Sequence, residues 1–175
     1  QGTESLGCHF ALSRNRPHDD RFIPSLRKLA DAAKSGGALA ILQLFHAGNK
    51  AVPELIPDGE LVSASALAAP AGPFNRGEQA SRALGHDEIS GVIHDFGEAT
   101  RRAIEAGFDG VELHGAHGFL IQNFFSPWFN QRTDEWGGSL ANRMRFPLEV
   151  VREVRRVIET HARKPFLLRY RGFVE

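Results

Sequence analysis

The chain has 175 residues, with 21 Lys plus Arg against 21 Asp plus Glu and a hydrophobic fraction of 42%, which is enough for one well-buried core. The formal net charge of zero gives no general attraction to nucleic acid or to an anionic membrane surface, so both partner classes are disfavoured. No apolar run approaches the length of a membrane-spanning helix, and residues 1–4 lack the pattern of a signal peptide. We therefore expect one domain over residues 1–175 and a cytoplasmic location.

Helical periodicity alternates with short apolar runs along the chain. Apolar residues recur at helical spacing over 19–34, 86–106 and 139–158. Runs typical of buried strands follow at 38–45, 108–114 and 165–171, and we expect one more strand before residue 19. Pro147 predicts a kink in the third helix or a later start for it. Strands that alternate with helices in this way predict an α/β fold with a parallel sheet.

Polar residues stand toward the carboxyl end of each predicted strand, which is where parallel α/β folds carry their chemistry. We expect the side chains of these residues to converge at one edge of the sheet. They are Gln43 and His46 on the first strand, Glu112, His114 and His117 on the second, and Arg169 and Arg171 on the third.

Two of these positions have alternative interpretations from the residues alone. Gln43 is either a satisfied buried amide or a ligand contact, and its amide suits a heterocycle edge with adjacent carbonyl and N–H groups. Arg169 and Arg171 share one side of their strand, and a buried guanidinium needs an anionic partner. That partner is a bound phosphate or anionic heterocycle, or it is Glu112 in an ordinary salt bridge.

The segment His-Gly-Ala-His-Gly contains His114 and His117. Its glycines disfavour a helical metal pair and let the backbone approach a flat ligand closely. The two imidazoles could donate together to one developing oxyanion, or they could simply cap the end of the strand. A third interpretation is a zinc site completed by His46 or Glu112, which would make the protein a metal-dependent barrel hydrolase.

Three longer segments carry a resemblance to a known family. They are residues 41–48 (ILQLFHAG), residues 110–120 (GVELHGAHGFL) and residues 126–147, which include the run Asn-Gln-Arg-Thr-Asp-Glu-Trp-Gly-Gly-Ser. Together they span about residues 20–171 and resemble the old yellow enzyme family of FMN-dependent oxidoreductases. The resemblance implies a parallel (β/α)8 TIM barrel, here an incomplete barrel covering about the first half to the middle.

The resemblance also implies an activity and roles for particular residues. The activity is that of an FMN-dependent NAD(P)H oxidoreductase of the ene-reductase type, which transfers hydride from NADH or NADPH through FMN to an activated alkene or a related small-molecule acceptor. Gln43 would contact the FMN pyrimidine edge, and Arg171, in preference to Arg169, would lie next to flavin N1 and the C2 carbonyl. His114 and His117 would bind and polarise the activating oxygen of the substrate. Phe119 would be a substrate-binding residue where relatives often carry a proton-donating tyrosine.

The chain is shorter than the complete barrel that the resemblance implies. A (β/α)8 barrel needs roughly 250 residues, and its phosphate-binding loops commonly follow strands seven and eight. Half of such a barrel supplies half of a flavin site and exposes sheet edges and apolar helix faces. We therefore expect dependence on self-association, as a homo-oligomer, or on further chain. A catalytically inactive barrel fragment is the non-enzymatic alternative.

Overall fold

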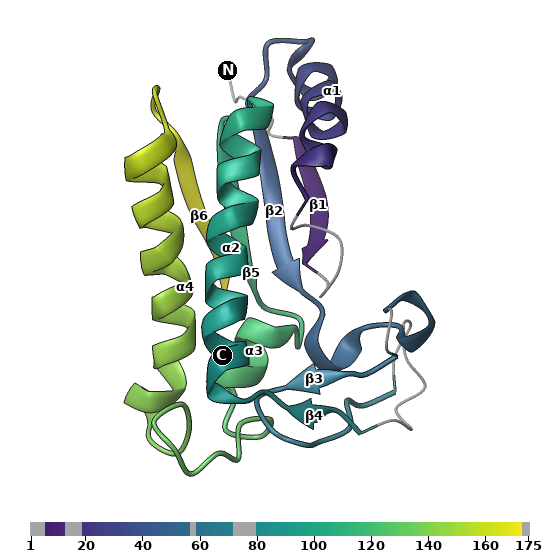
Figure 1. The fold of residues 1–175 in the computed structure, drawn as a ribbon, viewed down its shortest axis with the longest axis vertical. Helices are drawn as coiled ribbons and strands as arrows, with labels where there is room; N and C mark the ends of the chain where they lie inside the picture. The colour runs from purple at the N-terminus through teal and green to yellow at the C-terminus, as the bar shows by residue number, and fades with distance from the viewer. Residues whose placement is uncertain (1–5, 13–18, 57–58, 72–79, 173–175) are drawn as a thin grey trace.

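The computed structural model describes residues 6–12, 19–56, 59–71 and 80–172, without the side chains of residues 6–12 and of Leu55 (Figure 1). The helices are α1 (Ile23–Lys34), α2 (His86–Ala106), α3 (Leu120–Phe125) and α4 (Leu140–His161). The strands are β1 (Leu6–Leu12), β2 (Ala40–His46), β3 (Val62–Ser63), β4 (Arg82–Ala83), β5 (Gly110–Gly115) and β6 (Leu167–Gly172). Short 3₁₀ turns cover Asp20–Phe22, Gly48–Lys50 and Pro53–Leu55.

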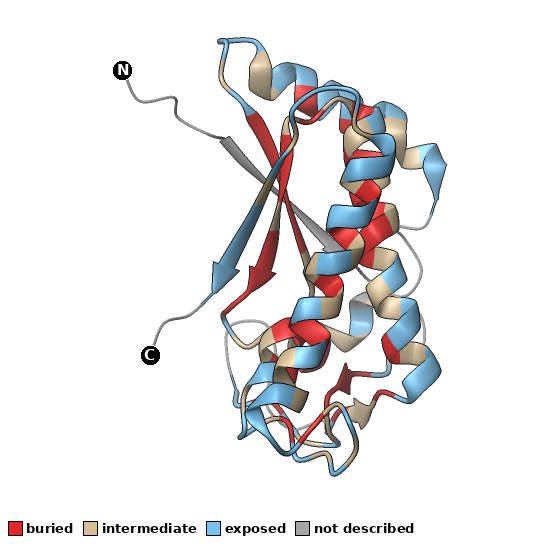
Figure 2. Cartoon of the chain, turned by 90° about the vertical axis from the view of Figure 1, so that its left-hand side faces the viewer, coloured by how far each residue is buried: buried red, intermediate tan, exposed pale blue. Residues whose placement is uncertain are grey.

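Four parallel strands form the main sheet in the order β1-β2-β5-β6, and β3 pairs with β4 in a small separate sheet. Figure 2 shows the main helices on one side of this sheet, while no helix of the described chain covers the other side, which we call the inner face. The predicted alternation of helices and parallel strands is therefore confirmed, including a strand before residue 19.

The hydrophobic core lies between the sheet and its helices, because alternate strand residues point toward the helices. Phe96 of α2 and Val154 of α4 are fully buried in this layer, and the rings of Phe124 and Phe146 stack with centroids 4.2 Å apart. The strand residues that face the helices are Leu42, Leu44, Val111, Leu113 and Leu168. The remaining alternation places Gln43, Glu112 and Arg169 on the inner face.

The helix ends follow local sequence signals. Pro24 lies in the first turn of α1, where a missing N–H is tolerated, and the side chain of Ser139 caps α4 by accepting from the Asn142 amide at 3.2 Å. The alternative of a later start for α4 is wrong, since the helix runs from Leu140 through Pro147. Pro147 and its neighbour Phe146 are both buried, and this burial offsets the hydrogen bond that proline cannot make.

Asp109 holds the amino ends of three strands together. Its carboxylate accepts from the Ala40 amide at 3.1 Å and from Lys164 Nζ at 2.8 Å, and its own carbonyl accepts from the Leu167 amide at 2.9 Å. Burial acts to raise the pKa of Asp109, but the hydrogen bonds from Lys164 and Ala40 outweigh burial, and the pKa lies below its usual value. This end of the sheet is thus fixed by polar contacts, while the opposite, carboxyl end carries the candidate site.

Candidate active site

The strand register places three polar side chains in one row across the inner face. Gln43 pairs with Glu112, and Glu112 pairs with Arg169, on adjacent strands. Gln43 Nε2 donates to Glu112 Oε1 at 2.6 Å, and Arg169 Nε lies 3.4 Å from Glu112 Oε2. The salt bridge that the sequence left as one of two alternatives for Arg169 is therefore present.

Nearer the carboxyl ends of the strands, His114 and His117 contact each other directly. Nε2 of His114 lies 3.1 Å from Nδ1 of His117, and the two rings meet edge to face at 86°. Only one of the two facing nitrogens can carry the hydrogen of this contact, and the other accepts it. The N–H group that lies between the rings is therefore not available to a ligand. Joint donation by both rings to a single oxygen requires one ring to turn.

An aromatic cluster sets the orientation of His114, which is 4% exposed. The ring of Phe119 lies 5.0 Å from the His114 ring and 4.9 Å from that of Phe45, measured between centroids. Arg171 pairs in register with His114 and is exposed. The structure thus brings the predicted residues Gln43, His114, His117, Phe119 and Arg171 to neighbouring positions on β2, β5, β6 and the loop after β5.

Both glycines of the His-Gly-Ala-His-Gly segment have side chains of the protein packed against them. A Cβ on Gly115 would collide with the ring and hydroxyl of Tyr170, and a Cβ on Gly118 would lie 2.7 Å from Lys50 Nζ. These glycines therefore accommodate neighbouring side chains of the protein. Lys50 Nζ also donates to the carbonyl of His117 at 2.7 Å, which ties the turn after β2 to the loop after β5.

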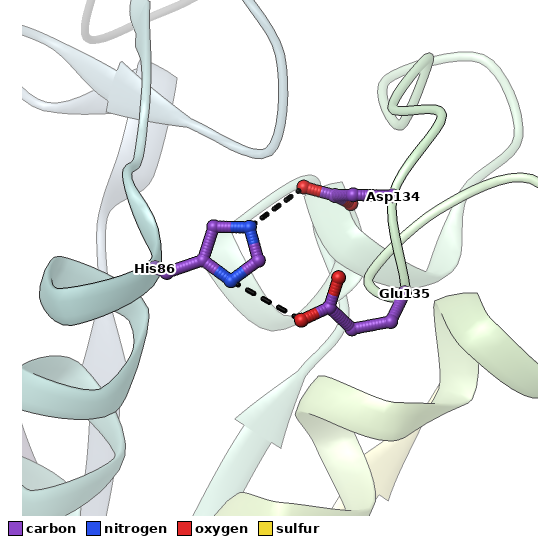
Figure 3. A group of neighbouring side chains, drawn as sticks. All are labelled: His86, Asp134 and Glu135. Carbon is purple, nitrogen blue, oxygen red and sulfur yellow. Dashed lines mark ion pairs between the residues drawn. The ribbon is translucent and has the colours of Figure 1, made fainter.

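The histidines of the sequence-derived zinc hypothesis do not gather into a metal site in the described residues. His46 Nδ1 instead accepts from the Gly48 amide at 3.0 Å. In that part of the chain, one group of three side chains has metal-ligating atoms within 4.8 Å of one another, and it consists of His86, Asp134 and Glu135 (Figure 3).

Figure 3 shows the His86 ring between two carboxylates. Its Nε2 lies 3.3 Å from Asp134 and its Nδ1 lies 3.2 Å from Glu135, so each nitrogen faces its own partner. Asp134 is also bound by Arg132, whose Nε lies 3.0 Å from each carboxylate oxygen. Ion pairing between the start of α2 and the segment before α4 accounts for the group, and we assign no metal to it.

One buried atom of the row has the features of a ligand contact. Gln43 is 4% exposed, and its Oε1 is buried without a hydrogen-bond partner among the residues that the structure describes. Leaving a buried acceptor unpaired costs about 1–3 kcal/mol, so such an atom is typical of a site completed by a ligand. Gln43 thus fits a planar heterocycle with an N–H group at its edge, such as the flavin ring of FMN.

No helix of the described residues is both long enough and apolar enough to cross a membrane.

Parallel strands that alternate with helices, with an amide, imidazoles and guanidinium groups toward the strand ends, define part of a β/α barrel. Residues 10–171 match the NADH:flavin oxidoreductase / NADH oxidase family, and the chain belongs to this family.

Relatives and solved structures agree with this assignment. The chain is 50% identical over 154 residues to a probable NADH-dependent flavin oxidoreductase, YqiG, of Bacillus subtilis (strain 168), covering 88% of the chain and 40% of that protein. It is 47% identical to the NADH:fumarate oxidoreductase of Klebsiella pneumoniae (strain 342), covering 87% and 16%. The structure of morphinone reductase matches with a TM-score of 0.75 and 30% identity, covering 95% and 49%. The chain thus spans less than half the length of these relatives, and its fold is part of a TIM barrel.

Proposed function

We propose that this chain is the part of an FMN-dependent NAD(P)H oxidoreductase that holds one edge of the flavin ring and the activating oxygen of the substrate. The observation that carries the proposal is the buried Oε1 of Gln43, which has no partner among the described residues, on the strand next to the one that carries His114. The family and the NADH-dependent relatives support it. Because fumarate, named for the Klebsiella relative, is an alkene conjugated to carboxylates, we infer an activated alkene as the substrate class.

Each residue has a role that its position permits. Gln43 would hold the pyrimidine edge of the ring, and Arg171 would supply positive charge near N1 and the C2 carbonyl. His114 and His117 hold the substrate oxygen and stabilise negative charge as it develops there. Phe119 forms an apolar contact for the substrate. When bound, FMN supplies the hydride chemistry between NADH or NADPH and the substrate.

The proton for the reduced alkene comes from a group other than a tyrosine of this chain. Phe119 has no exchangeable proton. The single tyrosine, Tyr170, alternates with Arg169 and Arg171 along β6, and its hydroxyl lies against Gly115 on the other side of the sheet from them. Water or another acid therefore fills this role.

Titration with FMN, followed by flavin fluorescence, tests the proposal. We expect saturable binding, and we expect Gln43→Met to raise Kd about tenfold, because one ligand hydrogen bond near 1.4 kcal/mol is lost. The matched control is Gln131→Met, which removes an exposed amide whose Nε2 donates a long hydrogen bond of 3.4 Å to the carbonyl of Trp128. Absence of any fluorescence change at saturating FMN would overturn the proposal.

We also propose that the chain associates with itself. Each end strand of the main sheet, β1 and β6, is paired on one side only within the described residues. Leu167 and Tyr170 on β6 are each 47% exposed, and Leu148 on α4 is 42% exposed. Unpaired strand edges flanked by apolar side chains favour association. A cytoplasmic location and a single domain over residues 1–175 stay predictions from the sequence.

Light scattering coupled to size-exclusion chromatography measures the mass of the associated protein directly. We expect a mass above that of the 19.3 kDa monomer, and we expect Leu148→Arg to shift the distribution toward the monomer. A monodisperse monomer that melts cooperatively at all concentrations would show that the exposed edges do not drive assembly.

A further inference from the structure

We propose that Glu112 is a positioning residue that fixes the orientation of the Gln43 amide, so that Gln43 offers its carbonyl oxygen to a ligand and thereby selects for an N–H donor. This inference rests on the proposed flavin function. It concerns a carboxylate that would not itself touch the reacting atoms.

The orientation follows from what a carboxylate can do. An ionised carboxylate only accepts hydrogen bonds, and Glu112 Oε1 lies 2.6 Å from the Gln43 nitrogen. The opposite amide rotamer would put two oxygens at that distance with no proton between them. The contact with Glu112 therefore determines which end of the Gln43 amide faces away, although an isolated amide could turn either way.

Glu112 is itself held from its other side. Arg169 Nε lies 3.4 Å from the second carboxylate oxygen, and the Glu112 side chain is only 14% exposed. The three residues belong to neighbouring strands in one register row, so backbone pairing sets their spacing. A carboxylate placed between an amide and a guanidinium is restrained far more than a surface glutamate.

The oriented amide has one acceptor left to offer. Gln43 Oε1 is buried and accepts no hydrogen bond from any side chain or backbone group that the structure describes. A ligand with an N–H at this point satisfies that oxygen, and the second Nε2 proton remains for an adjacent carbonyl. A ligand with an acceptor there leaves two buried oxygens facing each other. Such mismatches are rejected much more strongly than small changes in apolar shape.

The test compares Glu112→Gln with Glu159→Gln, whose side chain is 66% exposed in a surface ion pair. In the ligand-free chain, ¹⁵N NMR of the Gln43 side-chain amide reads its orientation without any flavin. We expect one Nε2 proton to be shifted downfield by the short bond to Glu112, and we expect this shift to disappear in Glu112→Gln only. An unchanged Gln43 signal in Glu112→Gln would overturn the proposal.

A double-mutant cycle on the Kd for FMN supplies the second readout. We expect Glu112→Gln and Gln43→Met each to raise Kd about tenfold, and the double variant to raise it about tenfold rather than a hundredfold. Additive effects would overturn the positioning role, because Glu112 would then act independently of Gln43. If wild-type chain binds no FMN, the proposed function fails, while the NMR comparison still decides what Glu112 does to Gln43.

Discussion

Replacement of His114 with alanine is expected to lower kcat/KM for an activated alkene by about 10²- to 10³-fold, the usual cost of removing one donor to a developing oxyanion. The imidazole is 4% exposed and is restrained by the ring of Phe119 and by the 3.1 Å contact with His117. Because the oxygen gains charge mainly in the transition state, the loss should fall on kcat more than on KM. Steady-state kinetics of the flavin-loaded protein with NADH or NADPH measure both constants.

Two comparisons make this result specific. His161→Ala, at the exposed end of α4, should leave kcat/KM unchanged. The double variant His114→Ala/His117→Ala should lose little more than His114→Ala, since residues that act as one unit are not additive. A His114→Ala protein that retains FMN and keeps kcat/KM within threefold of wild type would remove His114 from the reaction.

The second large effect is on stability. Arg132→Ala is expected to lower the free energy of unfolding by about 1.5–3 kcal/mol, because a partly buried guanidinium that makes several charged hydrogen bonds is removed. The Arg132 side chain is 11% exposed, and it binds the carboxylate of Asp134. Its Nη1 also donates to the carbonyl of Ala64 at 3.0 Å and to that of Leu84 at 2.7 Å. Urea unfolding at neutral pH measures the change.

The stability of Arg132→Ala should also depend on pH in a way that identifies its ion pair with Asp134. The hydrogen bond from Arg132 holds the pKa of Asp134 below its usual value of 3.8, which burial alone would raise. The pair therefore stabilises the fold above that usual value and loses its effect as the pH falls through the lowered pKa. The stability difference between wild type and Arg132→Ala should shrink in acid. Arg155→Ala, in a surface pair that is 74% exposed on the arginine side, should change stability by less than about 0.5 kcal/mol at any pH.

Long periodic segments could be predicted from the sequence because their pattern reflects burial directly. The helix predicted over 86–106 has the same bounds as α2, and the polar strand ends do meet on β2, β5 and β6. The short elements could not be predicted in this way. Helix α3 has six residues and no side-chain cap, and the β3–β4 pair joins strands of two residues that are far apart in the sequence.

The groups that pack closely against particular residues also could not be predicted from the sequence. A glycine indicates that something approaches the backbone, but its identity does not tell a ligand from Tyr170 or Lys50. The segment between α3 and α4 was recognised through its resemblance to a family, and its physical role emerges only in three dimensions. Asn130 Nδ2 donates to the carbonyls of Phe124 and Trp136 at 2.7 Å each, so much of that motif holds the loop together.

The backbone of His117 limits which residues can replace it. Its φ of 58° lies in the left-handed region, which asparagine, aspartate and histidine adopt more readily than other side chains and which glycine adopts without strain. A branched or bulky apolar residue at this position would strain the backbone of the loop, whatever its side chain could contribute to the reaction. Few substitutions of His117 are therefore tolerated by the backbone. Among them, asparagine preserves both the left-handed turn and a hydrogen-bond donor.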